Sequence, residues 1–283
     1  MSPSTAADQV LITAEELNDQ LGSDAPVILD VRWGLGLSDG RLDYAAGHVP
    51  GAVYANMDTQ LAAPPSQQGG RHPLPVIEDL QASARAWGIS SGSRVVVYDD
   101  ANNMAAARGW WLLRWAGLPD VRLMDGGLGA WRRAGFELET GMVSPPPGDV
   151  DLTPGHMPVL EADDAAALAR SGILLDARST ERFRGEAEPI DPVAGHIPGA
   201  VSAPTTETLA QDGRFAPAAD LAARFRSLGV DRDARVGVYC GSGVTAAHEI
   251  AALAAAGFGD AALYPGSWSQ WCGDPARPVA TGA

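Results

Sequence analysis

The chain is poor in cysteine, with only Cys240 and Cys272 among its 283 residues. Two cysteines rule out a disulfide framework, and neither has metal-ligand spacing relative to the five scattered histidines. A chain with so few cysteines suits a reducing cytoplasm, where a free thiol can serve as a reagent. We therefore expect a cytoplasmic location and no bound metal.

Basic residues and long apolar runs are also scarce. The chain has 20 basic and 35 acidic residues, which gives a formal charge of −15. Because so acidic a protein repels phosphate, we expect no nucleic-acid partner and no binding to an anionic membrane. An anionic substrate would need a local positive pocket. The first ten residues, MSPSTAADQV, lack the basic and apolar regions of a signal peptide, and we expect no transmembrane span.

The chain does contain an internal repeat. Residues 46–53 (AGHVPGAV) return as residues 194–201 (AGHIPGAV), and the apolar run 94–98 (RVVVY) returns as 235–239 (RVGVY). Other flanking segments recur in the same order. Since only two copies are present, the repeat indicates a duplicated domain rather than a solenoid.

Each copy alternates short apolar runs with helical patterns. In the second copy we expect strands at 173–177 and 235–239 and helices at 161–170, 217–228 and 245–256. In the first copy we expect helices at 76–87 and 104–116. This alternation predicts the α/β class, with two domains that are each a parallel sheet flanked by helices on both faces.

The copies also set the expected domain boundaries. We predict a first domain at residues 1–140 and a second at 156–283. A stiff, proline-rich linker at residues 141–155 would join them.

Cys240 stands where a parallel sheet binds ligands, directly after the predicted strand 235–239. The loop that follows it, Gly241-Ser242-Gly243-Val244-Thr245, leads into a predicted helix. Its glycines let backbone N–H groups turn inward, and together with the positive helix end these groups favour the thiolate, which is the nucleophile. The alternative is a small buried cysteine at a strand end. The equivalent position in the first copy is Asp99, which cannot carry sulfur, so we expect one active site for the pair.

The duplicated unit with its His-Ile-Pro-Gly-Ala run resembles the rhodanese family, and so does the cysteine loop after a buried strand. The resemblance covers nearly the whole chain and implies a catalytically inactive first domain and a catalytic second domain. The loop at 240–245 resembles the branch that uses 3-mercaptopyruvate. The thiosulfate branch carries cationic side chains just after the cysteine, where this chain has Gly241 and Ser242.

The resemblance implies a sulfurtransferase. Sulfur from 3-mercaptopyruvate, a small-molecule donor, would form a persulfide on Cys240 with release of pyruvate. An acceptor such as cyanide, a thiol or a thioredoxin-like protein would then take it. The family needs no metal or organic cofactor for this reaction.

The resemblance also carries site residues. It implies that Arg182 binds the substrate carboxylate, for which a guanidinium fork is well suited. The loop residues Gly241, Gly243, Val244 and Thr245 would bind substrate beside it. The alternative is that Arg182 forms a surface ion pair with Glu186 or Glu188.

A catalytic relay of Ser242, His72 and Asp58 is implied as well, since a histidine oriented by a carboxylate can move a proton through a serine hydroxyl. The alternative is that His72 lies in an exposed loop and contacts nothing. One position departs from the family pattern. The mercaptopyruvate branch has a second substrate-binding arginine after a Glu-Pro pair, and this chain has Ile190 there.

Three other functions stay open. The first is a thiosulfate sulfurtransferase. The second is a cysteine-dependent phosphatase, although Ala246 and Ala247 stand where such a loop needs an arginine. The third is a non-enzymatic binding module. We interpret His48 and His196 as structural, because the active and the inactive copy share them, and Cys272 as incidental.

Overall fold

The computed structural model describes residues 5–22, 24–34, 39–259 and 261–283. The chain forms two compact units, which we call unit 1 and unit 2. Unit 1 consists of Met1–Ala63, Pro75–His156 and Ala210–Phe215, and unit 2 consists of Pro64–Leu74, Met157–Leu209 and Ala216–Ala283. The segment 64–74 therefore belongs to unit 2, although it lies in the first half of the sequence.

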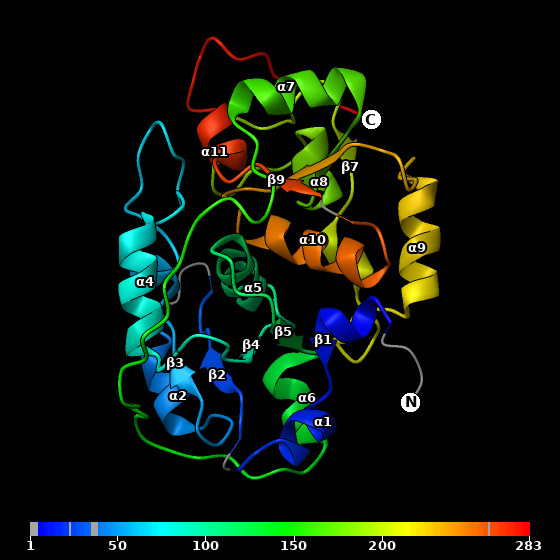
Figure 1. The fold of residues 1–283 in the computed structure, drawn as a ribbon. Coiled ribbons are helices and arrows are strands. Elements are labelled where there is room, and N and C mark those ends of the chain that lie inside the picture. The colour runs from blue at the N-terminus through cyan, green and yellow to red at the C-terminus, as the bar shows by residue number, and fades with distance from the viewer. Residues whose placement is uncertain (1–4, 23, 35–38, 260) are drawn as a thin grey trace. The chain divides into compact units, whose positions relative to one another are not determined.

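Unit 1 is built on a five-stranded parallel sheet with the order β1-β5-β4-β2-β3. Its elements are η1 (Ala7–Gln9), β1 (Leu11–Ile12), α1 (Ala14–Asp19), β2 (Val27–Asp30), α2 (Arg41–Ala46), β3 (Val53–Tyr54), α3 (Met57–Gln60), α4 (Ile77–Ala86), β4 (Val95–Tyr98), α5 (Ala106–Trp115), β5 (Val121–Met124) and α6 (Gly127–Arg133). All four residues of β4 are buried, because α5 covers one face of the sheet and α1 with α6 cover the other (Figure 1).

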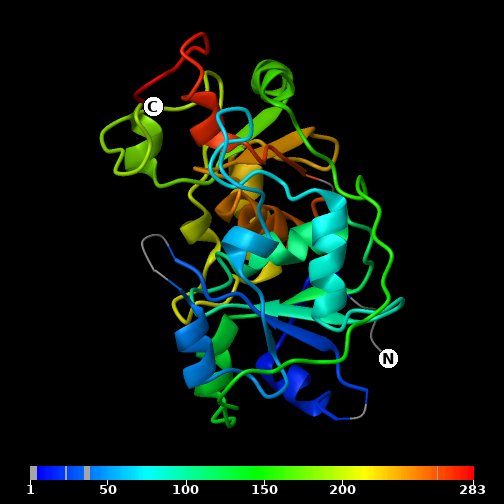
Figure 2. The same ribbon diagram turned by 90° about the vertical axis from the view of Figure 1, so that its left-hand side faces the viewer.

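Unit 2 repeats this plan with a four-stranded parallel sheet of order β7-β6-β8-β9. Its elements are α7 (Ala162–Ser171), β6 (Ile173–Asp176), α8 (Thr180–Arg184), β7 (Val201–Ser202), η2 (Thr205–Thr208), α9 (Ala218–Ser227), β8 (Val236–Tyr239), α10 (Thr245–Ala255), β9 (Ala262–Leu263) and α11 (Ser267–Trp271). Helices α7 and α11 pack on one face of the sheet and α10 on the other (Figures 1 and 2). The predicted fold class is confirmed.

The histidines of the repeated turn have the same surroundings in both units. The His48 ring stacks on Tyr44, and its Nδ1 lies 2.9 Å from the Tyr44 carbonyl oxygen. The His196 ring stacks on Phe183, and its Nδ1 lies 2.8 Å from the Phe183 carbonyl oxygen. Since a unit with a cysteine loop and a unit without one hold this histidine alike, the structure supports a structural role.

Each unit also buries an arginine–aspartate pair at the end of a strand. Arg32 Nε lies 2.8 Å from Asp30 Oδ1, and Arg178 Nη2 lies 2.6 Å from Asp176 Oδ2. Each arginine also donates to the carbonyl of the glycine that precedes the repeated histidine. Both arginines therefore tie the turn to the sheet.

The loop after β4 is filled by the carboxylate of Asp99, which is 1% exposed. It accepts four backbone N–H groups at 2.7–2.9 Å, from Ala101, Asn103, Ala105 and Ala106. Burial raises the pKa of Asp99, and these donors act against the rise. In unit 1, therefore, the Asp99 side chain accepts the hydrogen bonds that the inward-facing amides of this loop donate.

We predict that Asp99→Ala lowers the free energy of unfolding by about 2–5 kcal/mol, because it leaves several buried amides without an acceptor. Urea denaturation measures the loss. The neighbouring exposed Asp100 is the control, and Asp100→Ala should change the free energy by about 0.5 kcal/mol or less. Equal effects of the two substitutions would contradict this account of the loop.

Candidate active site

Cys240 follows β8 directly and is 2% exposed. The Gly243 amide donates a hydrogen bond to its Sγ over 3.1 Å. Gly243 has a φ of +76°, and a Cβ there would lie 2.5 Å from the Pro265 carbonyl oxygen. Only glycine fits this turn, which folds the chain back so that its amide faces the sulfur.

Other backbone N–H groups of the loop are available to a ligand. The backbone N–H groups of Ser242, Val244 and Thr245 make no hydrogen bond within the part of the chain that the structure describes. Helix α10 begins at Thr245, so its positive end adds to these donors. In unit 1 the carboxylate of Asp99 accepts the hydrogen bonds of the corresponding amides. In unit 2 these amides can donate to an anionic ligand instead.

Ser242 and His72 lie together, with Ser242 Oγ 2.8 Å from His72 Nδ1. Both are buried, at 6% and 8% exposed. The alternative of a His72 that contacts nothing is therefore wrong, and the pair is close enough to exchange a proton. Asp58 belongs to unit 1, where it accepts a hydrogen bond from Trp33 Nε1 over 3.1 Å. Its place in the relay stays a prediction.

Arg182 forms an ion pair and also lies beside the loop. Its Nη2 is 2.7 Å from Glu188 Oε1, and its Nε is 3.1 Å from Glu188 Oε2. The same guanidinium lies 3.5 Å from where a Cβ on Gly241 would stand. The ion pair that was the alternative interpretation is present, and it holds the cation next to the cysteine loop. Its role toward substrate stays a prediction.

Two carboxylates, Glu188 and Asp191, hold Arg182 in this corner of unit 2, and sequence reasoning named only Glu188, as an alternative partner of Arg182. The Glu188 and Asp191 side chains are each 3% exposed. Burial favours the neutral form of Glu188, but hydrogen bonds from Arg182 and from the Asp191 amide hold its pKa below the usual range. Burial raises the pKa of Asp191, and Arg71 and Arg182 act against the rise. Both acids are visible in the sequence, but the approach of Asp191 to Arg71 comes from tertiary structure.

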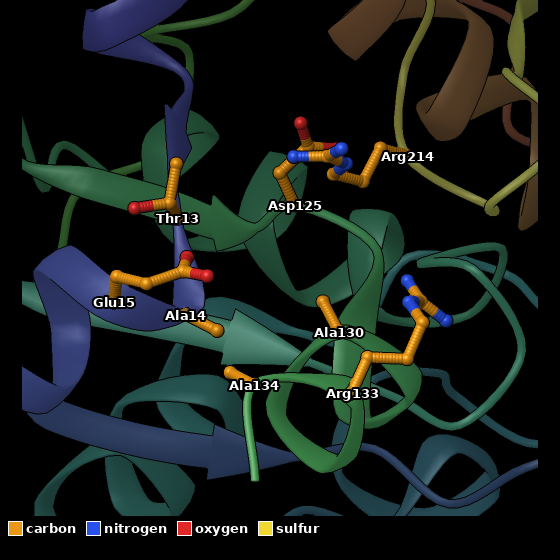
Figure 3. Close-up of a pocket in the computed structure, with 8 residues that line it drawn as sticks. All are labelled: Thr13, Ala14, Glu15, Asp125, Ala130, Arg133, Ala134 and Arg214. Atoms are coloured by element: carbon orange, nitrogen blue, oxygen red, sulfur yellow. The ribbon is translucent and has the colours of Figure 1, made fainter. Parts of the chain in front are cut away.

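A pocket lies at the carboxyl edge of the sheet in unit 1 (Figure 3). It encloses about 160 Å³ and is lined by Thr13, Ala14, Glu15, Asp125, Ala130, Arg133, Ala134 and Arg214. Burial raises the pKa of Asp125 to about 6, and Arg214 acts against the rise. The Thr13 hydroxyl oxygen accepts the Glu16 amide as a helix cap. This lining contains no thiol, so the pocket cannot form a persulfide.

Neither a metal centre nor a membrane span is found in the described ranges. No three His, Cys, Asp or Glu side chains there are grouped to hold a metal ion. Likewise, no helix in the same ranges combines the length and the apolar character needed to cross a bilayer.

Comparison with known proteins identifies the family of this chain. The model of the rhodanese-like domain matches the chain twice, at residues 13–134 and 161–274. A Mycobacterium tuberculosis protein named "Putative thiosulfate sulfurtransferase SseB" is 51% identical, over 98% of this chain and 99% of its own length. A Pseudomonas aeruginosa protein named "Probable 3-mercaptopyruvate sulfurtransferase" is 48% identical, over 96% of this chain and 98% of its own.

Solved structures agree with the sequence relatives. The structure of SseA from Escherichia coli, described as a 3-mercaptopyruvate sulfotransferase, superposes with a TM-score of 0.79 at 31% identity. The match covers 94% of this chain and 100% of SseA. Two matching segments and relatives that align over almost their full length show that the chain belongs to the rhodanese-like domain family.

Proposed function

We propose that this protein is a sulfurtransferase that takes sulfur from 3-mercaptopyruvate and carries it as a persulfide on Cys240. The observation that carries the proposal is the hydrogen bond from the Gly243 amide to Sγ, in a loop with further unused amides. These donors favour negative charge on sulfur both before and after transfer. The relatives named as 3-mercaptopyruvate sulfurtransferases support the same donor.

In the first half-reaction the Cys240 thiolate attacks the sulfur of 3-mercaptopyruvate. An S–S bond forms, and the C–S bond of the donor breaks. The bonding electron pair goes to carbon, which gives the enolate of pyruvate. The enolate takes a proton and leaves as pyruvate, and the outer sulfur remains on Cys240 as a persulfide anion held by the loop amides.

The proton for the enolate comes from the new persulfide, which still carries the hydrogen of the donor thiol. We assign its movement to Ser242 and His72, whose side chains are 2.8 Å apart. Arg182 binds the donor carboxylate, because its guanidinium lies beside Gly241, the residue after the nucleophile.

In the second half-reaction an acceptor takes the outer sulfur. A thiolate that attacks it becomes a persulfide, while cyanide becomes thiocyanate. Either attack breaks the S–S bond and restores the Cys240 thiolate. A small thiol or a thioredoxin-like protein fits this step, and a reducing cytoplasm would supply both. Such a compartment would also keep Cys240 and Cys272 reduced.

The alternative donor is thiosulfate, and the name of the Mycobacterium tuberculosis relative favours it. Attack on the outer sulfur of thiosulfate would give the same persulfide and release sulfite. The loop argues for 3-mercaptopyruvate, because Gly241 and Ser242 supply no cationic side chain of their own.

The two donors can be compared directly on the purified protein. We expect kcat/KM for 3-mercaptopyruvate to exceed that for thiosulfate by at least about tenfold, equivalent to about 1.4 kcal/mol. Pyruvate and sulfite release measure the two rates with one common acceptor. A preference for thiosulfate would reverse the assignment of the donor and leave the persulfide chemistry in place.

Replacing the nucleophile tests the persulfide. Cys240→Ser should abolish pyruvate release, and mass spectrometry should find no added sulfur on the protein after donor treatment, because a hydroxyl is a poor substitute for a thiolate. Cys272→Ala is the matched control and should keep both signals. A Cys240→Ser protein that still releases pyruvate would refute the mechanism.

The relay predicts non-additive effects. His72→Ala and Ser242→Ala should each lower kcat by about 100- to 10,000-fold, and the double variant should be no slower than the slower single variant, since the two residues act as one path. Pyruvate release under saturating donor measures kcat. The exposed histidine is the control, and His156→Ala should behave as wild type. Effects that multiply in the double variant would show that the two residues act separately.

A further inference from the structure

Two guanidinium groups, not one, converge on the residue after the nucleophile. A Cβ on Gly241 would lie 2.8 Å from Arg71 Nη2 and 3.5 Å from both terminal nitrogens of Arg182. Gly241 therefore leaves room for both cations. The chain brings positive charge to this point from two distant segments instead of from position 241.

Arg71 is held there by the segment 64–74, which belongs to unit 2. Its amide donates to Ser269 Oγ over 3.1 Å, and the preceding Gly70 has a φ of +78°. A Cβ on Gly70 would stand 2.6 Å from the Gly266 carbonyl oxygen, so only glycine permits this approach. The next residue, His72, contacts Ser242. One turn thus aims two consecutive side chains at the cysteine loop.

Asp191 joins the two guanidinium groups. One of its oxygens accepts from Arg71 Nη1, and the other accepts from Arg182 Nη2 over 3.1 Å. The neighbouring Ile190, in the place of the family's second arginine, is 38% exposed and apolar. Arg71 Nε is buried and has no acceptor within the described residues. An unpaired buried donor on a cation beside the nucleophile is suited to an anionic ligand group.

The charges in this corner balance before any donor binds. Three arginines, Arg71, Arg178 and Arg182, carry three positive charges, and three acids carry three negative charges, namely Asp176, Glu188 and Asp191. Such a neutral cluster suits a donor with one carboxylate better than a dianion such as thiosulfate. Removal of one of these acids would make the cluster more positive and would therefore favour binding of the dianion.

We propose that Arg71 is the second carboxylate-binding residue for the sulfur donor, in place of the arginine that this chain lacks at position 190, and that Asp191 is its internal counter-charge. The inference rests on the proposed function, because it concerns the carboxylate of 3-mercaptopyruvate. It adds a residue that the family pattern places elsewhere in the chain, and it makes the pair Arg71–Asp191 a determinant of donor choice.

The first test is Arg71→Met, measured by pyruvate release. We expect KM for 3-mercaptopyruvate to rise about 10- to 100-fold with little change in kcat, and inhibition by pyruvate to weaken by a similar factor. Arg184→Met on the exposed side of α8 is the matched control and should leave KM unchanged. Thermal unfolding of each variant establishes that it is folded.

A rescue separates a binding role from a structural one. Arg71→Met combined with Ile190→Arg should bring KM most of the way back to the wild-type value, because it returns a guanidinium to the place the family uses. Arg71→Lys keeps the charge without the fork and should give an intermediate KM. In Asp191→Asn, the ratio of kcat/KM for thiosulfate to that for 3-mercaptopyruvate should rise.

The possible failures are distinguishable. A wild-type protein that releases no pyruvate overturns both the proposed function and this inference. An active wild type with an unchanged KM in folded Arg71→Met overturns the inference alone. An unchanged or lower donor ratio in Asp191→Asn overturns the role of Asp191 as counter-charge.

Discussion

The hydrogen bonding of one loop, at the carboxyl end of the central strand in each sheet, governs the chemistry of this molecule. Backbone amides that turn inward at such a place require negative charge. In unit 1 the carboxylate of Asp99 meets four of them at 2.7–2.9 Å. In unit 2 the sulfur of Cys240 meets one, at 3.1 Å, and others have no partner in the described chain. The amides of this loop are therefore occupied by a carboxylate in unit 1, whereas those of unit 2 can accept an anionic ligand.

The charge of the protein makes local cations necessary. All 20 basic residues are arginines, since the sequence contains no lysine, and 35 acidic residues surround them. An anionic donor meets a repulsive long-range field, so its binding depends on guanidinium groups fixed close to the nucleophile. Buried acids fix them. Glu188 orients Arg182, and Asp191 links Arg182 to Arg71. Because these acids also cancel charge, the corner favours a ligand with one negative charge.

The sequence was sufficient to predict the fold and the position of Cys240 at the end of a strand, because both depend on local patterns. The expected helix at 245–256 is α10, Thr245–Ala255, and the expected strand at 235–239 is β8, Val236–Tyr239. Apolar periodicity and glycine stops are enough to locate such elements. The repeat shows which strand ends correspond, and so which loop holds a thiol and which holds a carboxylate.

The electrostatic surroundings of the site could not be predicted in this way. The pairing of Ser242 with His72 followed only from the family resemblance, since 169 residues separate them in the chain. Nothing local indicates that Arg71 approaches Asp191 or that Ile190 stays exposed. Such contacts arise from the packing of distant segments. The sequence shows that the arginine is missing at 190 and leaves Arg71 and Arg184 as possible replacements, and the structure places Arg71 beside Asp191 and Gly241.

The stoichiometry of a single turnover tests the central claim most directly. Wild-type protein is mixed with excess 3-mercaptopyruvate in the absence of any acceptor, and pyruvate and protein-bound sulfur are both counted. Our account predicts a rapid burst of one pyruvate per chain and one added sulfur atom, located on Cys240 by peptide mass spectrometry. A burst without sulfur on Cys240, or sulfur found instead on Cys272, would contradict it.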